Sequence, residues 1–174
     1  NNELVMVNMG QPKLLLNKPI YVGFSILDIS KTLIYKFHYD TVMKRYGPDN
    51  AKLLFTDTDS LCYQIVTADL YMVMYRMIDE IDTSNYPVEH HLYSKTNAKV
   101  LGKFKDETAS VPPIEFIGLK SKMYSLLVTP SDPAKLTAKG VTRSWVETNL
   151  RHDTFRDVLF KKAVTHADFQ KFVS

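Results

Sequence analysis

The sequence has little sulfur and no long hydrophobic run. Cys62 is its one cysteine, which excludes an internal disulfide and a cysteine-rich zinc site and predicts a reducing, intracellular location. No apolar stretch approaches the roughly 18–20 residues that a helix needs to cross a bilayer, so no membrane partner is predicted. Internal repeats and low-complexity segments are also missing. These absences leave a globular domain as the expected class.

The composition is that of a globular domain whose charge is unevenly distributed. Hydrophobic residues make up 45% of the 174 residues, enough for one buried core. Residues 1–94 contain 8 Lys/Arg and 11 Asp/Glu, whereas residues 95–174 contain 14 Lys/Arg and 8 Asp/Glu. A basic second half suggests a polyanionic partner such as nucleic acid, although an ordinary solvated surface gives the same counts. Because residues 1–20 begin without Met and show no helix or strand period, we expect a piece of a longer protein.

The clearest helical pattern covers residues 21–46. Pro19 precedes it, and Gly47 and Pro48 follow it, as expected of a helix start and stop. The wide apolar face predicts a helix that lies against a sheet. The residues that carry this period are Val22, Ile26, Ile29, Leu33, Phe37 and Met43.

The rest of the chain mixes strands and helices without a repeating βα order, which predicts the α+β class. Two short apolar strands flank a polar turn at residues 57–60 and predict a β-hairpin. An irregular connection is expected over residues 82–99. The predicted strands are Lys52–Thr56, Leu61–Val66, Ile114–Leu119, Met123–Val128 and, more weakly, Lys135–Ala138; the predicted helices are 69–80, Val141–Leu150, Asp153–Lys162 and Ala167–Phe172.

Asp57 and Asp59 are the residues with the most specific chemistry. Residues two apart in a strand point the same way, so the sequence predicts two carboxylates on one face of the hairpin. Such a pair is costly unless a cation or protons neutralise it, and magnesium prefers oxygen ligands of this kind. A solvated turn rich in Asp and Ser is the simpler alternative.

Three other sites with paired acids can be compared with this spacing. An EF-hand loop starting at Asp57 requires glycine and glutamate where this sequence has Cys62 and Ala68, so it is excluded. An aspartic protease turn requires glycine where Asp59 stands. A glycosyltransferase Asp-x-Asp site remains a distant alternative, because no alternating βα half precedes the pair. His90 and His91 are predicted to be a loop pair rather than a metal site, since adjacent residues of an extended chain point apart.

The residues around the two aspartates resemble motif C of the family B DNA polymerases. Phe55–Ser60 reads Phe-Thr-Asp-Thr-Asp-Ser, against the family's usual Tyr-x-Asp-Thr-Asp-Ser. Phe55 departs from that pattern, but its ring can keep the packing role of the tyrosine. The flanking residues Thr58 and Ser60 match the motif.

Further segments, in the right order over nearly the whole chain, are similar to the protein-primed branch of that family. Lys18–Phe24 resembles the stretch that joins the fingers to motif C, and Leu101–Glu107 resembles a Leu-Gly-x-aromatic segment. Lys122–Tyr124 matches the Lys-x-Tyr motif, and Lys139–Val141 resembles the basic stretch after it. Asp82–Pro87 is similar to the polymerases of Polinton (Maverick) transposons and related viruses.

The resemblance implies two-metal nucleotidyl transfer from deoxynucleoside triphosphates to a DNA primer-template. Asp59 is then the direct magnesium ligand of motif C, and Asp57 supports it; two Mg²⁺ ions roughly 3.5–4 Å apart serve the intact enzyme. Lys122 and Tyr124 are implied to hold the primer terminus. Lys120 and Lys139 are further candidates for contacts with the DNA backbone.

The resemblance also implies how the chain is organised. Residues 1–139 correspond to the C-terminal part of a polymerase palm, in which the motif C hairpin belongs to an antiparallel sheet packed against helices. Residues 140–174 correspond to the start of a helical, thumb-like part. A transposon polymerase implies a nuclear location, and a viral one implies a viral replication site.

Part of a complete active site is missing from this sequence. It contains neither the aspartate of motif A nor the Lys-x-x-x-Asn-Ser-x-Tyr-Gly of motif B, and no exonuclease carboxylate cluster. We therefore expect the chain alone to be inactive and to require the remainder of the polymerase chain as its partner. The alternative is a non-catalytic module, derived from a mobile-element polymerase, that binds nucleic acid or protein.

Overall fold

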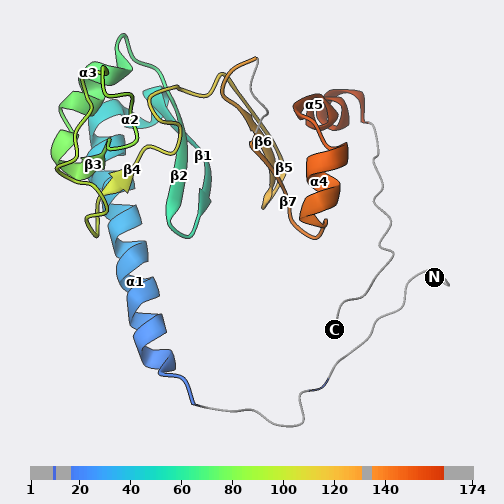
Figure 1. The fold of residues 1–174 in the computed structure, drawn as a ribbon, viewed down its shortest axis with the longest axis horizontal. Helices are drawn as coiled ribbons and strands as arrows, with labels where there is room; N and C mark the ends of the chain where they lie inside the picture. The colour runs from blue at the N-terminus through green and yellow to red at the C-terminus, as the bar shows by residue number, and fades with distance from the viewer. Residues whose placement is uncertain (1–9, 11–16, 131–134, 163–174) are drawn as a thin grey trace. The chain divides into compact units, whose positions relative to one another are not determined.

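The computed structural model describes residue 10, residues 17–130 and residues 135–162 (Figure 1). The chain forms two compact units, Asn1–Val66 and Thr67–Ser174. Helices are combined with small, mainly antiparallel sheets, which confirms the predicted α+β class. Within the described ranges, no helix combines the length and apolar character needed to cross a bilayer.

The first unit begins with a long helical segment, as predicted. Helix α1 (Ile20–Lys36) continues into the π-helix η1 (Phe37–Met43) and then into α2 (Lys44–Asn50). The backbone leaves helical geometry at Gly47, with φ 71° and ψ 171°, so the predicted helix end is confirmed. The π-helical stretch was not predicted, because the apolar spacing across it is close to that of an α-helix.

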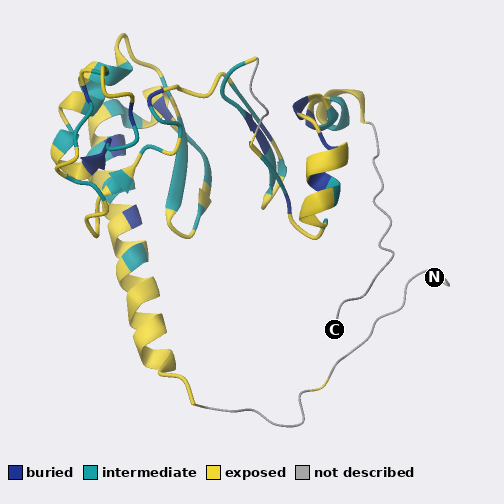
Figure 2. Cartoon of the chain, viewed as in Figure 1, coloured by how far each residue is buried: buried dark blue, intermediate teal, exposed yellow. Residues whose placement is uncertain are grey.

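Among the described residues, the apolar face of this segment is buried only toward its C-terminal end. Ile34 and Val42 are buried at 6% and 2% exposure. The His38 ring stacks on Tyr63 with centroids 5.9 Å apart, so η1 packs on the hairpin that follows. The expected packing against a sheet is therefore confirmed for this part alone. The first turns of α1 expose their apolar residues (Figure 2), namely Ile20, Tyr21, Val22, Phe24, Ile26, Leu27 and Ile29.

Gly47 supplies a testable feature of this unit. Its φ and ψ lie in a region that is nearly restricted to glycine, although a Cβ there would meet no atom within 4 Å. Gly47→Ala is therefore expected to lower the free energy of unfolding by about 1–3 kcal/mol through backbone strain alone. The matched control is Gly23→Ala within α1, where a Cβ also meets nothing and the change should stabilise by about 0.5–1 kcal/mol. Urea unfolding followed by far-UV circular dichroism measures both; equal effects would contradict the strain argument.

The predicted hairpin follows the helix. Strand β1 (Ala51–Asp57) pairs antiparallel with β2 (Ser60–Ile65), with an irregularity in register between Leu53 and Phe55. Ala51 is buried at the base of the hairpin, and the opposite end carries the two aspartates. The hairpin is a two-stranded sheet of its own.

The second unit begins with short elements joined by loops. Helix α3 (Leu70–Tyr75) starts at Asp69, whose carboxylate accepts a hydrogen bond from the Met72 amide at 3.0 Å. The predicted helix over 69–80 is wrong in its length, because the chain breaks after Tyr75 and continues as the 3₁₀ helix η2 (Ile78–Glu80). The predicted irregular connection is confirmed. Its ends meet in a short parallel pair of β3 (Ile81–Asp82) and β4 (Phe104–Lys105).

The C-terminal part of this unit is a meander covered by two helices. Its strands lie in the order β5 (Glu115–Lys120), β6 (Met123–Leu127), β7 (Lys135–Ala138), all antiparallel. Helices α4 (Arg143–Asn149) and α5 (His152–Lys161) follow. These strands and helices were predicted close to their observed ranges. The predicted helix Ala167–Phe172 lies outside the described residues.

One hydrophobic cluster joins α4 and α5 to the meander. Its buried members come from β5, β7 and both helices, and the indole of Trp145 packs against them. The buried members are Ile117, Ala138, Val146, Leu150 and Phe155.

The boundary between palm and thumb that the resemblance places between residues 139 and 140 stays a prediction.

Candidate functional site

The turn of the β1–β2 hairpin carries the paired carboxylates. Asp57 pairs with Ser60 across the hairpin, which leaves Thr58 and Asp59 as a two-residue turn. Thr58 has φ 56°, a left-handed conformation that a two-residue hairpin turn requires. The Asp59 amide donates to the Asp57 carbonyl at 2.6 Å, and the Ser60 hydroxyl donates to the same carbonyl at 3.3 Å.

The prediction that strand alternation places the Asp57 and Asp59 carboxylates on one face is wrong. Asp57 ends strand β1, but Asp59 lies in the turn, so strand alternation does not relate their side chains. The turn that carries Asp59 is closed by hydrogen bonds to the Asp57 carbonyl. Asp57 is half-buried and Asp59 is exposed.

These donors suit a magnesium site that is completed from outside the hairpin. Over the described ranges, no group of three or more His, Cys, Asp or Glu residues is placed to hold a metal. Magnesium is commonly held by one or two carboxylates together with water and substrate phosphates. The oxygen chemistry of Asp57 and Asp59 fits that pattern.

The strand behind the turn offers no reactive group. Burial raises the pKa of the Cys62 thiol, which keeps it protonated and unreactive. Burial also raises the pKa of Tyr63 to about 12. The Tyr63 hydroxyl lies 2.9 Å from His38 Nδ1. This contact anchors β2 to η1. Asp57 and Asp59 are the only residues with a carboxylate side chain in β1, β2 and their turn.

Three predicted DNA-contacting lysines gather at one end of the β5–β7 meander. Lys120 pairs with Met123 at the β5–β6 turn, and Lys122 lies in that turn with φ 56°. The Lys139 amide donates to the Lys122 carbonyl at 3.0 Å, which brings the end of β7 to the same turn. All three side chains are exposed. This end of the sheet presents three positive charges within a few residues of one another.

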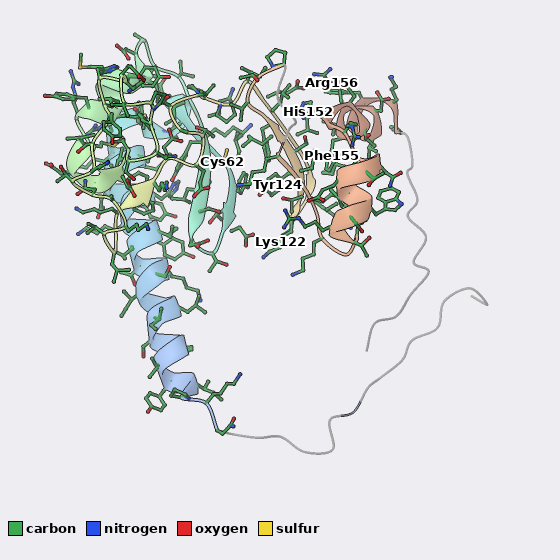
Figure 3. The ribbon with its side chains drawn as sticks, in the orientation of Figure 1. Cys62, Lys122, Tyr124, His152, Phe155 and Arg156 are labelled. Atoms are coloured by element: carbon green, nitrogen blue, oxygen red, sulfur yellow. The ribbon has the colours of Figure 1, made fainter. Side chains whose placement is uncertain are left out.

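Tyr124 lies beside this cluster on strand β6 (Figure 3). The prediction that strand alternation places the Tyr124 and Lys122 side chains on one face is wrong. Lys122 precedes strand β6 and has left-handed backbone geometry. The Tyr124 ring packs against Phe116 with centroids 5.9 Å apart. A Cβ at Gly118, directly across from Tyr124, would come within 3.0 Å of the Phe116 ring. Gly118 therefore makes room for the ring that supports Tyr124.

The predicted residues thus form two groups in different compact units. Asp57 and Asp59, with Thr58 and Ser60, belong to the first unit; the lysines and Tyr124 belong to the second.

Two segments that resemble the polymerase family, Asp82–Pro87 and Leu101–Glu107, have structural roles in the second unit. Asp106 accepts hydrogen bonds from the Tyr86 hydroxyl at 2.7 Å and from the Thr108 and Ser110 amides at 2.8 and 3.0 Å. Burial opposes ionisation of Asp106, but these hydrogen bonds outweigh it and lower the pKa of this carboxyl. Hydrogen bonding from the side chain and the amide of Ser84 lowers the pKa of Asp82 as well. These two carboxylates fix loops rather than form an exposed site.

The prediction that His90 and His91 point apart is wrong. The rings of His90 and His91 do not point apart but stack with centroids 4.6 Å apart, and both contact the ring of Tyr71 edge-on. His90 Nδ1 accepts a hydrogen bond from the Leu92 amide at 3.1 Å. The pair belongs to an aromatic cluster in a loop.

A chain of polar side chains that links β5, β6 and α5 was not predicted from the sequence. Ser125 Oγ lies 2.6 Å from His152 Nδ1, and both residues are buried. His152 Nε2 lies 3.3 Å from a Glu115 carboxylate oxygen, and Arg156 pairs with the same carboxylate. Up to 41 residues separate these partners in the sequence, so no local pattern could have indicated the chain.

Comparison with known proteins finds no relative of this chain. No protein-family model matches the chain, and no curated protein and no solved structure matches it either.

Proposed function

We propose that this chain is part of a DNA-directed DNA polymerase and contributes one of its two metal-binding motifs and its primer-terminus contacts. The observation that carries this proposal is the pair Asp57 and Asp59 at the tip of a tight hairpin, within a sequence that resembles motif C. A protein that only binds nucleic acid has no chemical need for paired carboxylates at an exposed turn. The basic end of the β5–β7 meander gives further support.

Each group has a role in nucleotidyl transfer. Asp59, exposed in the turn, offers its carboxylate as the direct metal ligand, while Asp57 at the strand end supports it. When bound, magnesium supplies a positive charge that favours attack by the primer 3′-hydroxyl on the α-phosphate and departure of pyrophosphate. Side chains of this chain act by position and charge rather than by proton transfer.

The primer end would be held by the meander. Lys122, in the β5–β6 turn, supplies a point charge to a backbone phosphate, and Tyr124 offers a ring and hydroxyl supported by Phe116. Lys120 and Lys139 lie at the same end of the sheet and add contacts that raise affinity without reading sequence.

The proposal is tested by what the natural transcript encodes upstream of Asn1. We expect an in-frame aspartate motif followed by Lys-x-x-x-Asn-Ser-x-Tyr-Gly. The encoded longer chain should extend a DNA primer with magnesium, whereas the 174-residue chain should not, because one ligand motif of two cannot hold a productive metal pair. A stop codon or unrelated sequence upstream would contradict the proposal and favour the non-catalytic binding module. Robust extension by the short chain would contradict the assignment of a half-site.

A further inference from the structure

The face of the β5–β7 meander that is turned away from α4 and α5 carries two aromatic rings next to a glycine. Ile117 lies in the hydrophobic cluster under the helices, so strand alternation places its neighbours Phe116 and Gly118 on the opposite face. Tyr124 pairs directly with Gly118 and shares that face. The Phe116 ring reaches Tyr124 diagonally across the strand pair, with centroids 5.9 Å apart and the ring planes tilted by 37°.

Gly118 leaves space that the Phe116 ring uses. A Cβ at this position would lie 3.0 Å from Cε1 and 3.1 Å from Cζ of that ring, closer than ordinary van der Waals contact. The backbone itself does not require glycine here, because Gly118 does not have the left-handed φ of Gly47, Gly102 and Gly140. What the position requires is therefore the absence of a side chain.

A side chain at position 118 would also affect Tyr124. The Phe116 ring would have to give by a few tenths of an ångström. Because strand pairing holds the backbone of Phe116, the ring moves by rotation of its side chain, and this changes its contact with Tyr124. The three residues therefore form one unit, in which the position of the Tyr124 ring depends on the other two.

We propose that Gly118 and Phe116 are positioning residues, which hold the Tyr124 ring where it contacts the end of a DNA primer. The inference rests on the proposed function, from which it takes the contact between Tyr124 and the primer. It adds that the position of the ring, and not only its presence, sets the affinity for the primer-template. Lys122 acts by its charge and is not part of this support.

Anisotropy of a fluorescent primer-template bound to the 174-residue chain tests the proposal. Tyr124→Ala should weaken binding roughly tenfold, as expected for the loss of one aromatic contact with nucleic acid. Gly118→Ala should weaken it about fivefold, because the added methyl group displaces the Phe116 ring. Combined with Tyr124→Ala, it should cause no further loss, since it acts through the tyrosine ring. The control is Gly23→Ala, which adds the same methyl group where it meets no atom and should leave binding unchanged.

Two further readouts separate positioning from a general loosening of the sheet. Displacing an uncharged ring leaves the phosphate contacts in place, so Gly118→Ala should keep the slope of log K against log salt concentration. Lys122→Gln should lower the magnitude of that slope by about 0.9. In NMR spectra, Gly118→Ala should shift the Tyr124 ring signals, because the neighbouring Phe116 ring moves, whereas Gly23→Ala should not.

The outcomes distinguish this inference from the proposed function. If Tyr124→Ala weakens binding but Gly118→Ala does not, if their losses add, or if Gly118→Ala changes the salt slope, the positioning role is overturned and the primer contact stands. No binding by the unaltered chain, or no loss for Tyr124→Ala, would overturn the primer contact and this inference with it. Should Gly118→Ala fail to fold, Phe116→Leu removes the ring and should give the same fivefold loss, again only while Tyr124 is present.

Discussion

Replacing Asp59 by asparagine is expected to reduce primer extension by the longer chain about a thousandfold, which corresponds to about 4 kcal/mol of transition-state stabilisation. The amide keeps the size of the carboxylate but removes the negative charge that a hard cation requires. Since Asp59 is exposed at the turn and its amide, not its carboxylate, closes the hairpin, the fold should be unchanged. Primer-template affinity should also change little, because the lysines lie in the other unit.

The control for this change is Asp49→Asn, an exposed aspartate of the same unit just before β1. It should retain full activity. A second measurement needs only the 174-residue chain: Mn²⁺ should broaden the amide signals of residues 57–60, and Asp59→Asn should suppress the broadening. Comparable broadening around Asp49, or an active Asp59→Asn enzyme, would rule out the assigned ligand.

Phe155→Ala is expected to have the largest effect on stability. The Phe155 ring is 3% exposed in the cluster that joins α4 and α5 to the meander. Its removal leaves a cavity between a helix and a sheet, and such changes cost about 3–5 kcal/mol. Trp145, the single tryptophan, packs against the same cluster, so its fluorescence during urea unfolding reports the loss directly.

The matched control lies on the same helix. Phe160 is 72% exposed, and Phe160→Ala should change the free energy of unfolding by no more than about 0.5 kcal/mol. Similar losses for the two variants would mean that helix propensity, rather than packing, explains the result for Phe155.

Much of the fold was predictable because its elements are encoded locally. Gly47 and Pro48 end the long helix where the sequence indicated, and the polar residues 57–60 form the turn between two apolar strands. The helix over 69–80 was overestimated because Met77 and Ile78 continue its apolar spacing while the backbone turns away after Tyr75. Spacing alone does not reveal such a break.

The residues of the candidate site remain a prediction from the sequence, and the geometry that the sequence predicted for them is wrong. Asp57, Asp59, Lys122 and Tyr124 were chosen by residue type. Strand alternation does not relate Asp57 to Asp59 or Lys122 to Tyr124, because Asp59 and Lys122 lie in turns. The contact between Ser125 and His152 could not be predicted at all, since 27 residues separate them. Long-range polar contacts require the packed structure.

The contacts of the hairpin have a consequence for the order of folding. Its strands are joined by a two-residue turn, and its link to η1 spans only 25 residues, from His38 to Tyr63. By comparison, Glu115 and Arg156 of the other unit meet over 41 residues. Because loop closure over short separations is faster, and synthesis proceeds from the N-terminus, the aspartate-bearing hairpin should form while the strand of Tyr124 is still being synthesised.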